Sequence, residues 1–462
     1  MHSSFTHRPM GRTLGVLTVA LSTALAGCGG GEFDAEADSA SASVQSEVGL
    51  DDRARALSAG TSTLDAALTE SAATFGPVAG TTQTQKLGAP NGMAGDLFGW
   101  SVASAGSRMV VGAPQESVLY RITNTRGSAY VFDESGSLVR ELLPASATEL
   151  RRDDAYGRAV AGSSSLIVVG SPGADDVGQF AGEVFVFDAQ TGAQTTKLVP
   201  TSTRRNPADG SAFGSAVDVS ADRIVVGAPG TFINGSASIG GHGAIYLYDA
   251  NTRRLIARVT PPGTRAKDNV GHAVSVEGST VVAGAPFDSI SAREAGAAYV
   301  FSASNGGLRF KLTASDASAD DRFGFAVSTS GGLIAVGAPF DDDHGSASGS
   351  VYLFDAATGA LVRKIVANDA GVNDQFGIAL DLVGNTLVVG AWGDNDGAGS
   401  VYVFDVSTGN QLGKLVASDA APRDILGRSV ALSGSSVIAG AARDADRGTD
   451  SGSVYRFGLP TP

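Results

Sequence analysis

The sequence contains few cysteine, histidine and basic residues and lacks several common catalytic motifs. It has one cysteine, Cys28, in 462 residues, so no disulfide can form within the chain. Outside the first 27 residues only three histidines occur, His242, His272 and His344, and their scatter argues against a zinc site. Lys and Arg number 33 against 47 Asp and Glu, with a net charge of −14, which argues against a nucleic-acid partner. G-x-S-x-G, H-E-x-x-H and Walker A motifs are also absent, so no enzyme class is favoured.

The N-terminal segment has the pattern of an export signal. Residues 1–27 hold the basic group His7, Arg8 and Arg12, followed by an apolar run at 13–24 and then small residues. That run is too short to span a bilayer, so a cleaved signal peptide is expected rather than a membrane helix.

The four residues 25–28, "LAGC", resemble the bacterial lipobox. The resemblance implies cleavage before Cys28 and a lipid on its thiol, and Gly29 in the next position favours the outer membrane. An ordinary signal peptide with an incidental cysteine is the alternative. Translation starts at Met1 or at Met10, and the sequence fits both.

Residues 28–81 are predicted to be a disordered acidic tether. They are rich in Ala, Ser, Thr and Gly, and carry nine acids against two arginines, which leaves too little apolar surface to form a core. Removal of residues 1–27 takes away two arginines and no acid, so the net charge changes from −14 to −16. The tether is expected to hold an acidic domain away from the membrane.

Three short motifs recur seven times over the remainder of the chain. The first comprises "FGWSV" (98–102), "YGRAV" (156–160), "FGSAV" (213–217), "VGHAV" (270–274), "FGFAV" (323–327), "FGIAL" (376–380) and "LGRSV" (426–430). The second comprises "VGAP" (111–114), "VGSP" (169–172), "VGAP" (226–229), "AGAP" (283–286), "VGAP" (336–339), "VGAW" (389–392) and "AGAA" (439–442). The third comprises "GSAYVF" (127–132), "GEVFVF" (182–187), "GAIYLY" (243–248), "GAAYVF" (296–301), "GSVYLF" (349–354), "GSVYVF" (399–404) and "GSVYRF" (452–457). Each reads as a short strand bounded by glycine.

A fourth strand follows the third in six of the repeats, as in "QLGKLVA" at 411–417. Four strands in each unit of this length indicate the blades of a propeller. The seventh repeat ends without a fourth strand, whereas an unpaired "TQTQKLGA" precedes the first repeat at 82–89. The sequence therefore predicts an all-β fold, a seven-bladed β-propeller over 82–462 that is closed by its N-terminal strand.

These motifs resemble the FG-GAP repeat, the unit of the integrin α-subunit propeller and of many bacterial surface proteins. The resemblance extends over residues 82–462 and includes both the "FG" and the "GAP" half in most copies. It implies a β-propeller and says little about chemistry.

Loop lengths differ between the two predicted faces of the ring. The first-motif glycine precedes the second-motif glycine by the same interval in all seven repeats, whereas the segments after "GAP" vary in length. The longest such loops, 115–126 and 230–242, contain the candidate binding residues Tyr120, Arg121, Arg126, Phe232 and His242. Variable loops are frequent binding surfaces, although drift without selection gives the same pattern.

The residue that follows each "FG" also varies, while its neighbours change little. These residues are Trp100, Arg158, Ser215, His272, Phe325, Ile378 and Arg428. If the first strand is innermost, Arg158, His272 and Arg428 line the central channel, where they could hold an anionic group. Packing differences between blades are the alternative explanation.

The family resemblance implies calcium between "FG" and "GAP", but the seven turns at that position lack closely spaced oxygen ligands. Acids cluster elsewhere, at Asp341, Asp342 and Asp343, and in "DNDG", with Asp394, Asn395 and Asp396. Further acids, Asp153, Asp154, Asp320, Asp321 and Asp374, lie in the segments between blades. Either these are solvated turn residues or the first two groups are weak Ca²⁺ sites; no other cofactor is expected.

The sequence thus predicts a monomeric, lipid-anchored binding or adhesion module of the cell envelope, with a protein or glycan partner. Two alternatives stay open. One is a hydrolase or lyase that acts near His272 and Arg158, and the other is a passive structural component of the envelope.

Overall fold

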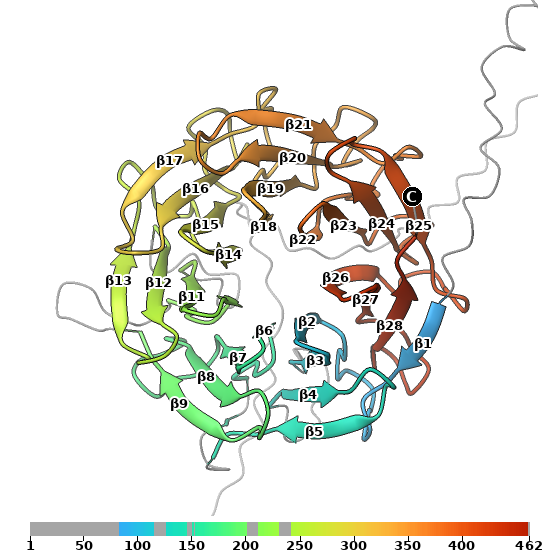
Figure 1. Ribbon diagram of the computed structural model, residues 1–462. Coiled ribbons are helices and arrows are strands. Elements are labelled where there is room, and N and C mark those ends of the chain that lie inside the picture. Colours follow the sequence, from blue (N-terminus) through green and yellow to red (C-terminus); the bar gives the residue numbers. More distant parts are fainter. Residues whose placement is uncertain are drawn as a thin grey trace, which may run out of the picture. The chain divides into compact units, whose positions relative to one another are not determined.

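The computed structural model of the protein describes residues 83–114, 126–145, 150–151, 153–200, 211–230 and 242–460. In these residues the chain forms seven four-stranded antiparallel sheets around a central axis (Figure 1). The predicted all-β, seven-bladed propeller is confirmed. The predicted signal peptide, Cys28 and the tether lie outside the described residues, among which no helix is long and apolar enough to cross a bilayer.

Each blade has four strands, with the first nearest the axis and the fourth at the rim. Blades one to three consist of β2 (Ser101–Ala105), β3 (Arg108–Ala113), β4 (Ser128–Phe132) and β5 (Leu138–Leu142); β6 (Ala159–Gly162), β7 (Leu166–Ser171), β8 (Glu183–Asp188) and β9 (Gln194–Leu198); and β10 (Ala216–Val219), β11 (Arg223–Ala228), β12 (Ala244–Asp249) and β13 (Leu255–Val259). Blades four and five consist of β14 (Val274–Glu277), β15 (Thr280–Ala285), β16 (Ala297–Ser302) and β17 (Leu308–Leu312); and β18 (Ala326–Ser330), β19 (Leu333–Ala338), β20 (Ser350–Asp355) and β21 (Leu361–Ile365). Blades six and seven consist of β22 (Ala379–Val383), β23 (Thr386–Ala391), β24 (Ser400–Asp405) and β25 (Gln411–Leu415); and β26 (Leu426–Ser433), β27 (Ser436–Ala441), β28 (Ser453–Gly458) and β1 (Gln83–Leu87).

The last blade combines the two ends of the domain. β1 pairs antiparallel with β28, with Lys86 opposite Tyr455 and Leu87 opposite Val454, and Figure 1 shows the blue strand beside the red one. The predicted closure by the N-terminal strand is therefore confirmed. The pairing covers the outer edge of β28, which would otherwise expose unpaired backbone groups.

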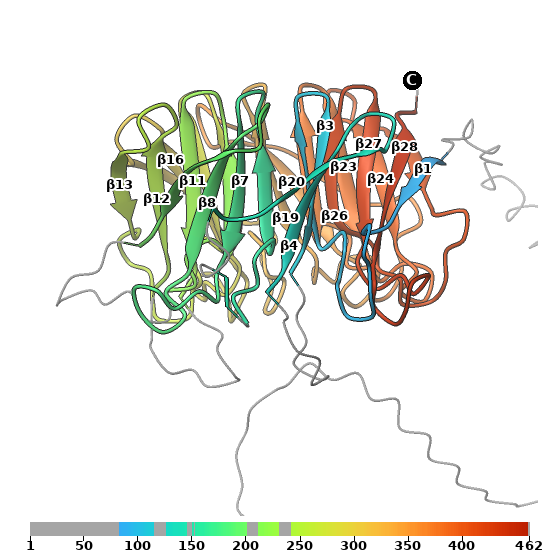
Figure 2. The ribbon, with the colours of Figure 1, turned by 90° about the horizontal axis from the view of Figure 1, so that it is seen from below.

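The two faces of the ring differ in their connections (Figure 2). First and second strands are joined by turns of two or three residues, such as 331–332, and third and fourth strands by five-residue turns, such as 356–360. These turns form one face, called here the turn face. The opposite face, called the loop face, carries the segments that join second to third strands and the segments between blades. The segments that join second to third strands vary in length; the shortest is 392–399 in blade six and the longest is 229–243 in blade three.

The repeated glycines mark places where neighbouring blades touch through their backbones. A Cβ on the second-motif glycine of each blade would lie less than 3.0 Å from the carbonyl oxygen of the first-motif glycine of the next blade, as between Gly337 and Gly377. The same contact between Gly440 and Gly99 joins blade seven to blade one. Such an approach leaves no room for a side chain, which explains why the glycines recur while other positions vary.

The hydrophobic core is divided among the interfaces between blades. The first-motif aromatic residues are fully buried and pack against tyrosine and phenylalanine of the third strand in the same blade. In blade five, for example, Phe323 meets Phe354 edge-on at a centroid distance of 5.9 Å. Val454 of β28 shares one cluster with Phe98 and Val102 of blade one, so the closing interface is packed like the others.

Candidate functional site

The loop face contains most of the residues that the sequence singles out for binding. Tyr120, Arg121 and Phe232, together with segments 115–125 and 231–241, lie outside the described residues. Arg126 and His242 are described and exposed, and they occupy matching positions in blades one and three. The Arg126 carbonyl accepts a hydrogen bond from the Tyr156 amide, and the His242 carbonyl accepts one from Val270, at 3.2 and 3.3 Å. Both residues thus mark where a variable loop meets the rigid ring.

A second group of predicted residues surrounds the axis. Trp100 and Arg158 immediately precede the innermost strands of blades one and two, and Arg428 lies at the start of β26. The guanidinium carbons of Arg158 and Arg428 lie 4.5 and 4.0 Å from the centroid of the Trp100 ring. Cations at this distance from an indole ring are attracted by its electron-rich face. The structure therefore brings three first-motif variable residues, from blades one, two and seven, into one contact group.

His272 belongs to the same region. Its ring lies 4.5 Å from that of Phe325, and Nδ1 is 3.1 Å from the Phe325 carbonyl oxygen. Burial, together with the positive charges of Arg158, Arg428 and Arg322, lowers the pKa of His272 to about 4. The imidazole is therefore neutral at pH 7, so Nδ1 carries the proton that faces the carbonyl and Nε2 is left as an acceptor. His272 can therefore offer a hydrogen-bond acceptor in this group but no positive charge at pH 7.

Two further participants were missed by the sequence reasoning. Arg322 directly precedes the blade-five "FG", and its guanidinium lies 5.0 and 4.5 Å from the rings of Phe287 and Phe340. Trp392 replaces the proline of "GAP" in blade six and lies 5.5 Å from the Arg428 guanidinium. The broken motif "VGAW" was the available signal for Trp392. Trp100, Arg158, His272, Arg322, Phe325, Trp392 and Arg428 are called the axial cluster below.

A hollow of about 590 Å³ adjoins the axial cluster on the loop face. It is lined by 371–375 and by Gly393, Asn395 and Asp396. Gln375, one of its lining residues, accepts a hydrogen bond of 2.6 Å from the Trp392 indole. One lining residue of the hollow is thus bonded to the axial cluster, while the hollow itself is lined by the segment before blade six and by the blade-six loop.

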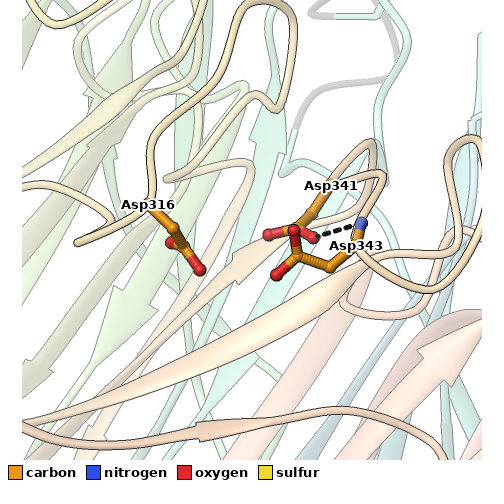
Figure 3. A group of neighbouring side chains, drawn as sticks. All are labelled: Asp316, Asp341 and Asp343. Atoms are coloured by element: carbon orange, nitrogen blue, oxygen red, sulfur yellow. Dashed lines mark hydrogen bonds between the residues drawn. The ribbon is translucent and has the colours of Figure 1, made fainter.

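The acids predicted as a weak calcium site in blade five surround a lysine instead. The ammonium of Lys364 lies 2.8, 2.9 and 2.5 Å from the carboxylates of Asp316, Asp341 and Asp343. Figure 3 shows these three carboxylates turned toward one another, with the Asp343 amide donating to Asp341. The Tyr352 hydroxyl lies 2.7 Å from both Asp316 and Asp341, so it can donate its proton to either.

Lys364 occupies the position that a metal ion would take among these oxygens. Asp341 is 4 % exposed, so its charge depends on that pairing. Asp342 belongs to a different contact, because its carboxylate accepts the Ala347 amide at 2.7 Å.

The predicted site in blade six is divided in the same manner. Asp394 accepts hydrogen bonds from Lys414, at 2.6 Å, and from the Tyr402 hydroxyl, at 2.9 Å. Burial alone would raise the pKa of Asp394, but these hydrogen bonds hold it below its usual value. The Asn395 amide contacts Ser400 at 3.3 Å, and Asp396 is exposed. Asp394 is thus paired with Lys414 and Tyr402, and Ser400 is a hydrogen-bond partner of both Asp394 and Asn395.

Several of the acids between blades are buried and hydrogen-bonded to the backbone, so they are not simply solvated turn residues. The buried carboxylates of Asp154, Asp321 and Asp374 each accept the backbone amide three residues earlier, at 2.5 to 2.6 Å. Burial is the first cause that raises the pKa of Asp154 and of Asp321 to about 6. Asp153 is exposed, and Asp320 pairs with Arg293. These loops are therefore held in shape just before each "FG".

A comparison with protein families matches this architecture. The FG-GAP repeat model matches residues 81–132, 146–187, 254–301, 308–354, 360–404 and 410–457. The chain belongs to the FG-GAP repeat family. No curated protein matches the sequence.

The FG-GAP repeat is offset from the structural blade by one strand. The matched segment 308–354 runs from β17 to β20, and 81–132 runs from β1 to β4. Five of the six matched segments therefore start at the rim strand of one blade and end in the third strand of the next, whereas 146–187 starts after the rim strand β5. Because of this offset, a ring of such repeats closes only when the first rim strand joins the last blade. Blade three, whose β10, β11 and β12 lie outside the matched segments, has the same four strands.

The FG-GAP frame also reveals a lysine that recurs on the rim strands. Lys86, Lys197, Lys311, Lys364 and Lys414 occupy the same position in the fourth strands of blades seven, two, four, five and six. Each lies within 3.2 Å of a buried or nearly buried acid, which is Asp444, Glu183, Asp288, Asp341 and Asp394 in that order. These groups are called the outer lysine clusters. The sequence signal was the repeated "KL" or "KI" of the fourth strand, which was used for strand counting alone.

Proposed function

We propose that this FG-GAP propeller is a cell-envelope-anchored binding module that presents its loop face to a protein or glycan partner. The observation that carries the proposal is the unequal division of variation between the faces. Turns on the turn face differ by at most one residue from blade to blade, whereas the segments on the loop face differ by several. Length variation on one side of a rigid scaffold is typical of surfaces whose loops determine binding.

The axial cluster supports the same choice of face. Six of its seven residues precede or begin innermost strands, and Trp392 directly follows the second strand β23, so all seven lie at strand ends that meet the loop face. The members are half-buried, so they are held by packing and still reach solvent. Rigid aromatic and arginine side chains in such positions are frequent binding hot spots.

The membrane anchor in this proposal is a lipid on Cys28, supported by "LAGC" and by the acidic segment that separates it from β1. In a bacterial host, Cys28→Ser should move the protein from the membrane fraction to the soluble fraction and abolish incorporation of labelled fatty acid. Membrane retention of Cys28→Ser would contradict the anchor while leaving the binding proposal intact.

Replacing 115–125 or 231–241 by a short Gly-Ser linker tests the binding role. We expect partner capture from envelope and extracellular extracts to be lost, with the thermal midpoint unchanged within a few degrees. Ala357→Arg, an exposed substitution on the turn face, is the matched control and should bind normally. Unchanged capture after both loop replacements would contradict the proposal and favour a passive envelope component.

A hydrolase or lyase is the second candidate, favoured by one observation. The neutral His272 imidazole has an acceptor nitrogen close to the positive charges of Arg158 and Arg428, so it could orient a substrate hydroxyl beside these cations; its low pKa makes it a weak proton acceptor at pH 7. Turnover of an ester, phosphodiester or uronate substrate that is lost in His272→Ala would establish this activity. Absence of turnover on all three classes would set it aside.

A further inference from the structure

The outer lysine cluster of blade two differs from the clusters of blades four to seven in the source of its buried acid. In blade five that acid is Asp341, which stands two residues after "VGAP", and blades four, six and seven have an aspartate at the same position. Blade two has Ala174 there, two residues after "VGSP". Its acid is Glu183, at the start of the third strand β8, so the carboxylate reaches the lysine from a different element.

A tyrosine is also missing from the cluster of blade two. In blade five, Tyr352 lies opposite Lys364, and its hydroxyl is 2.7 Å from Asp341. In blade two, Phe185 lies opposite Lys197 in the same register, so no hydroxyl group is offered from that position. The other three clusters keep a tyrosine within 2.9 Å of their aspartate; these are Tyr299, Tyr402 and Tyr455.

The Glu183 carboxylate is therefore buried with only one of its two oxygens bonded. Its side chain is 0 % exposed, and Oε1 lies 3.2 Å from the Lys197 ammonium. Oε2 has no hydrogen-bond partner among the described residues, and a buried charged oxygen without a donor is costly. A proton on Oε2 removes this cost, because the carboxyl group can then donate to the neighbouring Asp176 carboxylate.

The charged groups around Glu183 come from three elements. β9 contributes Lys197, and the segment 172–182 and the segment before blade two contribute the others, which are Asp175, Asp176, Arg151 and Asp154. Arg151 pairs with Asp176 at 3.0 Å, whereas Asp175 and Asp154 accept backbone amides. The remaining neighbours are uncharged, since Ser171 of β7 lies opposite Glu183 and segment 211–215 has no titratable residue. Ionised Glu183 would thus share one ammonium with Asp176.

We propose that Glu183 carries a proton below neutral pH, shared with Asp176, and that release of this proton to water at higher pH loosens the segment 172–182. Blade two thus contains a pH-sensitive switch that acts on one segment of the loop face. The segment responds because Asp176 belongs to it and is repelled once the buried Glu183 is charged. The switch is a property of the blade and does not depend on the proposed binding function.

The direction of the pH dependence follows from the shift of Glu183. Burial is the first cause that raises its pKa to about 7 in the fold, and Asp176 adds to the shift while Lys197 opposes it. The pKa is about 4.3 in the unfolded chain, so between these values the folded chain binds more protons. Stability is therefore full below pH 4.3 and falls as the pH rises to 7.

Glu183→Gln imitates the protonated form, because its amide can accept from Lys197 and donate to Asp176. In urea melts, the ratio of the unfolding constants of wild type and Glu183→Gln should rise about a hundredfold between pH 4.5 and pH 7.5. Groups that titrate in both proteins, such as His272, cancel in this ratio. Glu141→Gln, at an exposed glutamate on the rim strand β5, is the matched control and should give a constant ratio. A constant ratio for Glu183→Gln would overturn the proposal.

Phe185→Tyr tests the missing hydroxyl group. A hydroxyl at this position can donate to the Glu183 carboxylate, as Tyr352 does to Asp341, and hydrogen bonds to the charged form favour ionisation. We expect the ratio of unfolding constants of Phe185→Tyr and of the double variant with Glu183→Gln to rise about tenfold over the same pH range. A rise as large as that of the wild type would contradict the assigned role of the hydroxyl.

Hydrogen exchange of the full chain at pH 5.5 and pH 8 tests the response of the segment. The exchange rates of the amides of 176–182 in wild type, divided by those in Glu183→Gln, should be severalfold higher at pH 8, and base catalysis of exchange cancels in this quotient. The matching segment 342–349 of blade five, where Asp341 keeps its tyrosine, should give the same quotient at both pH values. A quotient for 176–182 that does not change with pH would show that the proton stabilises the blade without moving the segment, and would overturn the switch.

Discussion

The outer lysine clusters and the axial cluster both place cations toward the loop face, but in opposite surroundings. At the rim, the Lys364 ammonium is held by three carboxylates and a tyrosine within its own blade or the segment before it. At the axis, Arg158 and Arg428 from different blades lie against one indole ring. The rim arrangement recurs in five of the seven blades, whereas the side chain next to the axis changes among tryptophan, arginine, histidine and phenylalanine from blade to blade.

This difference indicates that the repeated residues at the rim stabilise the fold, whereas the residues at the axis can vary from blade to blade. The charge of an ammonium surrounded by aspartates is neutralised within the protein, so it contributes little to the binding of a partner. Removing that ammonium leaves the buried aspartates unpaired and destabilises the fold. A guanidinium stacked on an aromatic ring is attracted by about 1 kcal/mol or less at half-exposed sites. Removal of rim cations should therefore affect folding, and removal of axial cations should affect binding.

Deletion of 83–87 is expected to have the largest effect, since it removes both the rim strand β1 and Lys86 from blade seven. The Lys86 ammonium contacts Asp419, Asp444 and Asp446, and their loss leaves a nearly buried Asp444 unpaired beside an exposed β28 edge. We expect the free energy of unfolding to fall by about 5 kcal/mol in urea melts, combining the lost pair with the lost strand. Lys86→Met, which keeps the strand, should lose about half as much. An equally stable truncated domain would show that the ring does not need this closure.

Lys364→Met should have the next largest effect. It leaves Asp316, Asp341 and Asp343 without their shared cation, and we expect a loss of about 3 kcal/mol, reduced from the fully buried case because Asp343 is 53 % exposed. These acids have oxygens within 4.8 Å of one another, so millimolar Ca²⁺ should restore part of the variant's stability and leave the wild type unchanged.

The matched control for Lys364→Met is Lys267→Met, an exposed lysine in a loop, which should be neutral with or without Ca²⁺. Stabilisation of the wild type by Ca²⁺ to the same degree would mean that the rim acids bind the ion without displacing the lysine.

His272→Gln should have a smaller and pH-dependent effect. The pKa of His272 is about 4 in the fold and about 6.5 when unperturbed, so between these values the unfolded chain binds more protons. Stability from the neutral imidazole is thus present above pH 6.5 and lost as the pH falls to 4. The variant escapes this loss, so its stability relative to the wild type should improve by about 2 kcal/mol between pH 7 and pH 4.

Urea melts at pH 7, 5.5 and 4.5 measure this difference, with His344→Gln, at an exposed histidine, as the control. A difference between wild type and His272→Gln that does not change with pH would contradict the neutral, buried imidazole.

Arg158→Gln should have the smallest effect on folding, a loss below about 1 kcal/mol, because the side chain is half-buried and contacts between a cation and an aromatic ring are weak at such sites. Tryptophan emission should nevertheless shift, since the guanidinium lies on Trp100. A loss of stability as large as that of Lys364→Met would remove the distinction between rim and axis.

The fold could be predicted from the sequence because its limiting contacts involve glycine backbones. Gly337 and Gly377 approach too closely for any side chain. Glycine therefore recurs at these two positions in every blade, and the blades can be counted from the sequence. The incomplete seventh repeat and the unpaired "TQTQKLGA" then determined the closure. These signals are local, and each repeat confirms the others.

The candidate site could be predicted only in part. Arg158, His272 and Arg428 were recognised because they vary inside a constant motif, but Arg322 and Trp392 lie just outside it. The charge of His272 depends on burial and on arginines from three other places in the chain. The acids at Asp341 and Asp343 suggested a metal because their counterion, Lys364, follows 21 residues after Asp343 on a strand whose pattern indicated only β structure.

The pairing of β1 with β28 also has a consequence for the order in which the molecule is made. β1 is the first strand of the ring to leave the ribosome, and its partner is the last. Until β28 has been made, β1 has no strand to pair with, and the growing chain is an open arc with two unpaired blade surfaces. A nascent chain of this kind is vulnerable to misassembly with neighbouring chains. The yield of functional protein should therefore depend on how well the open arc is protected until the ring closes.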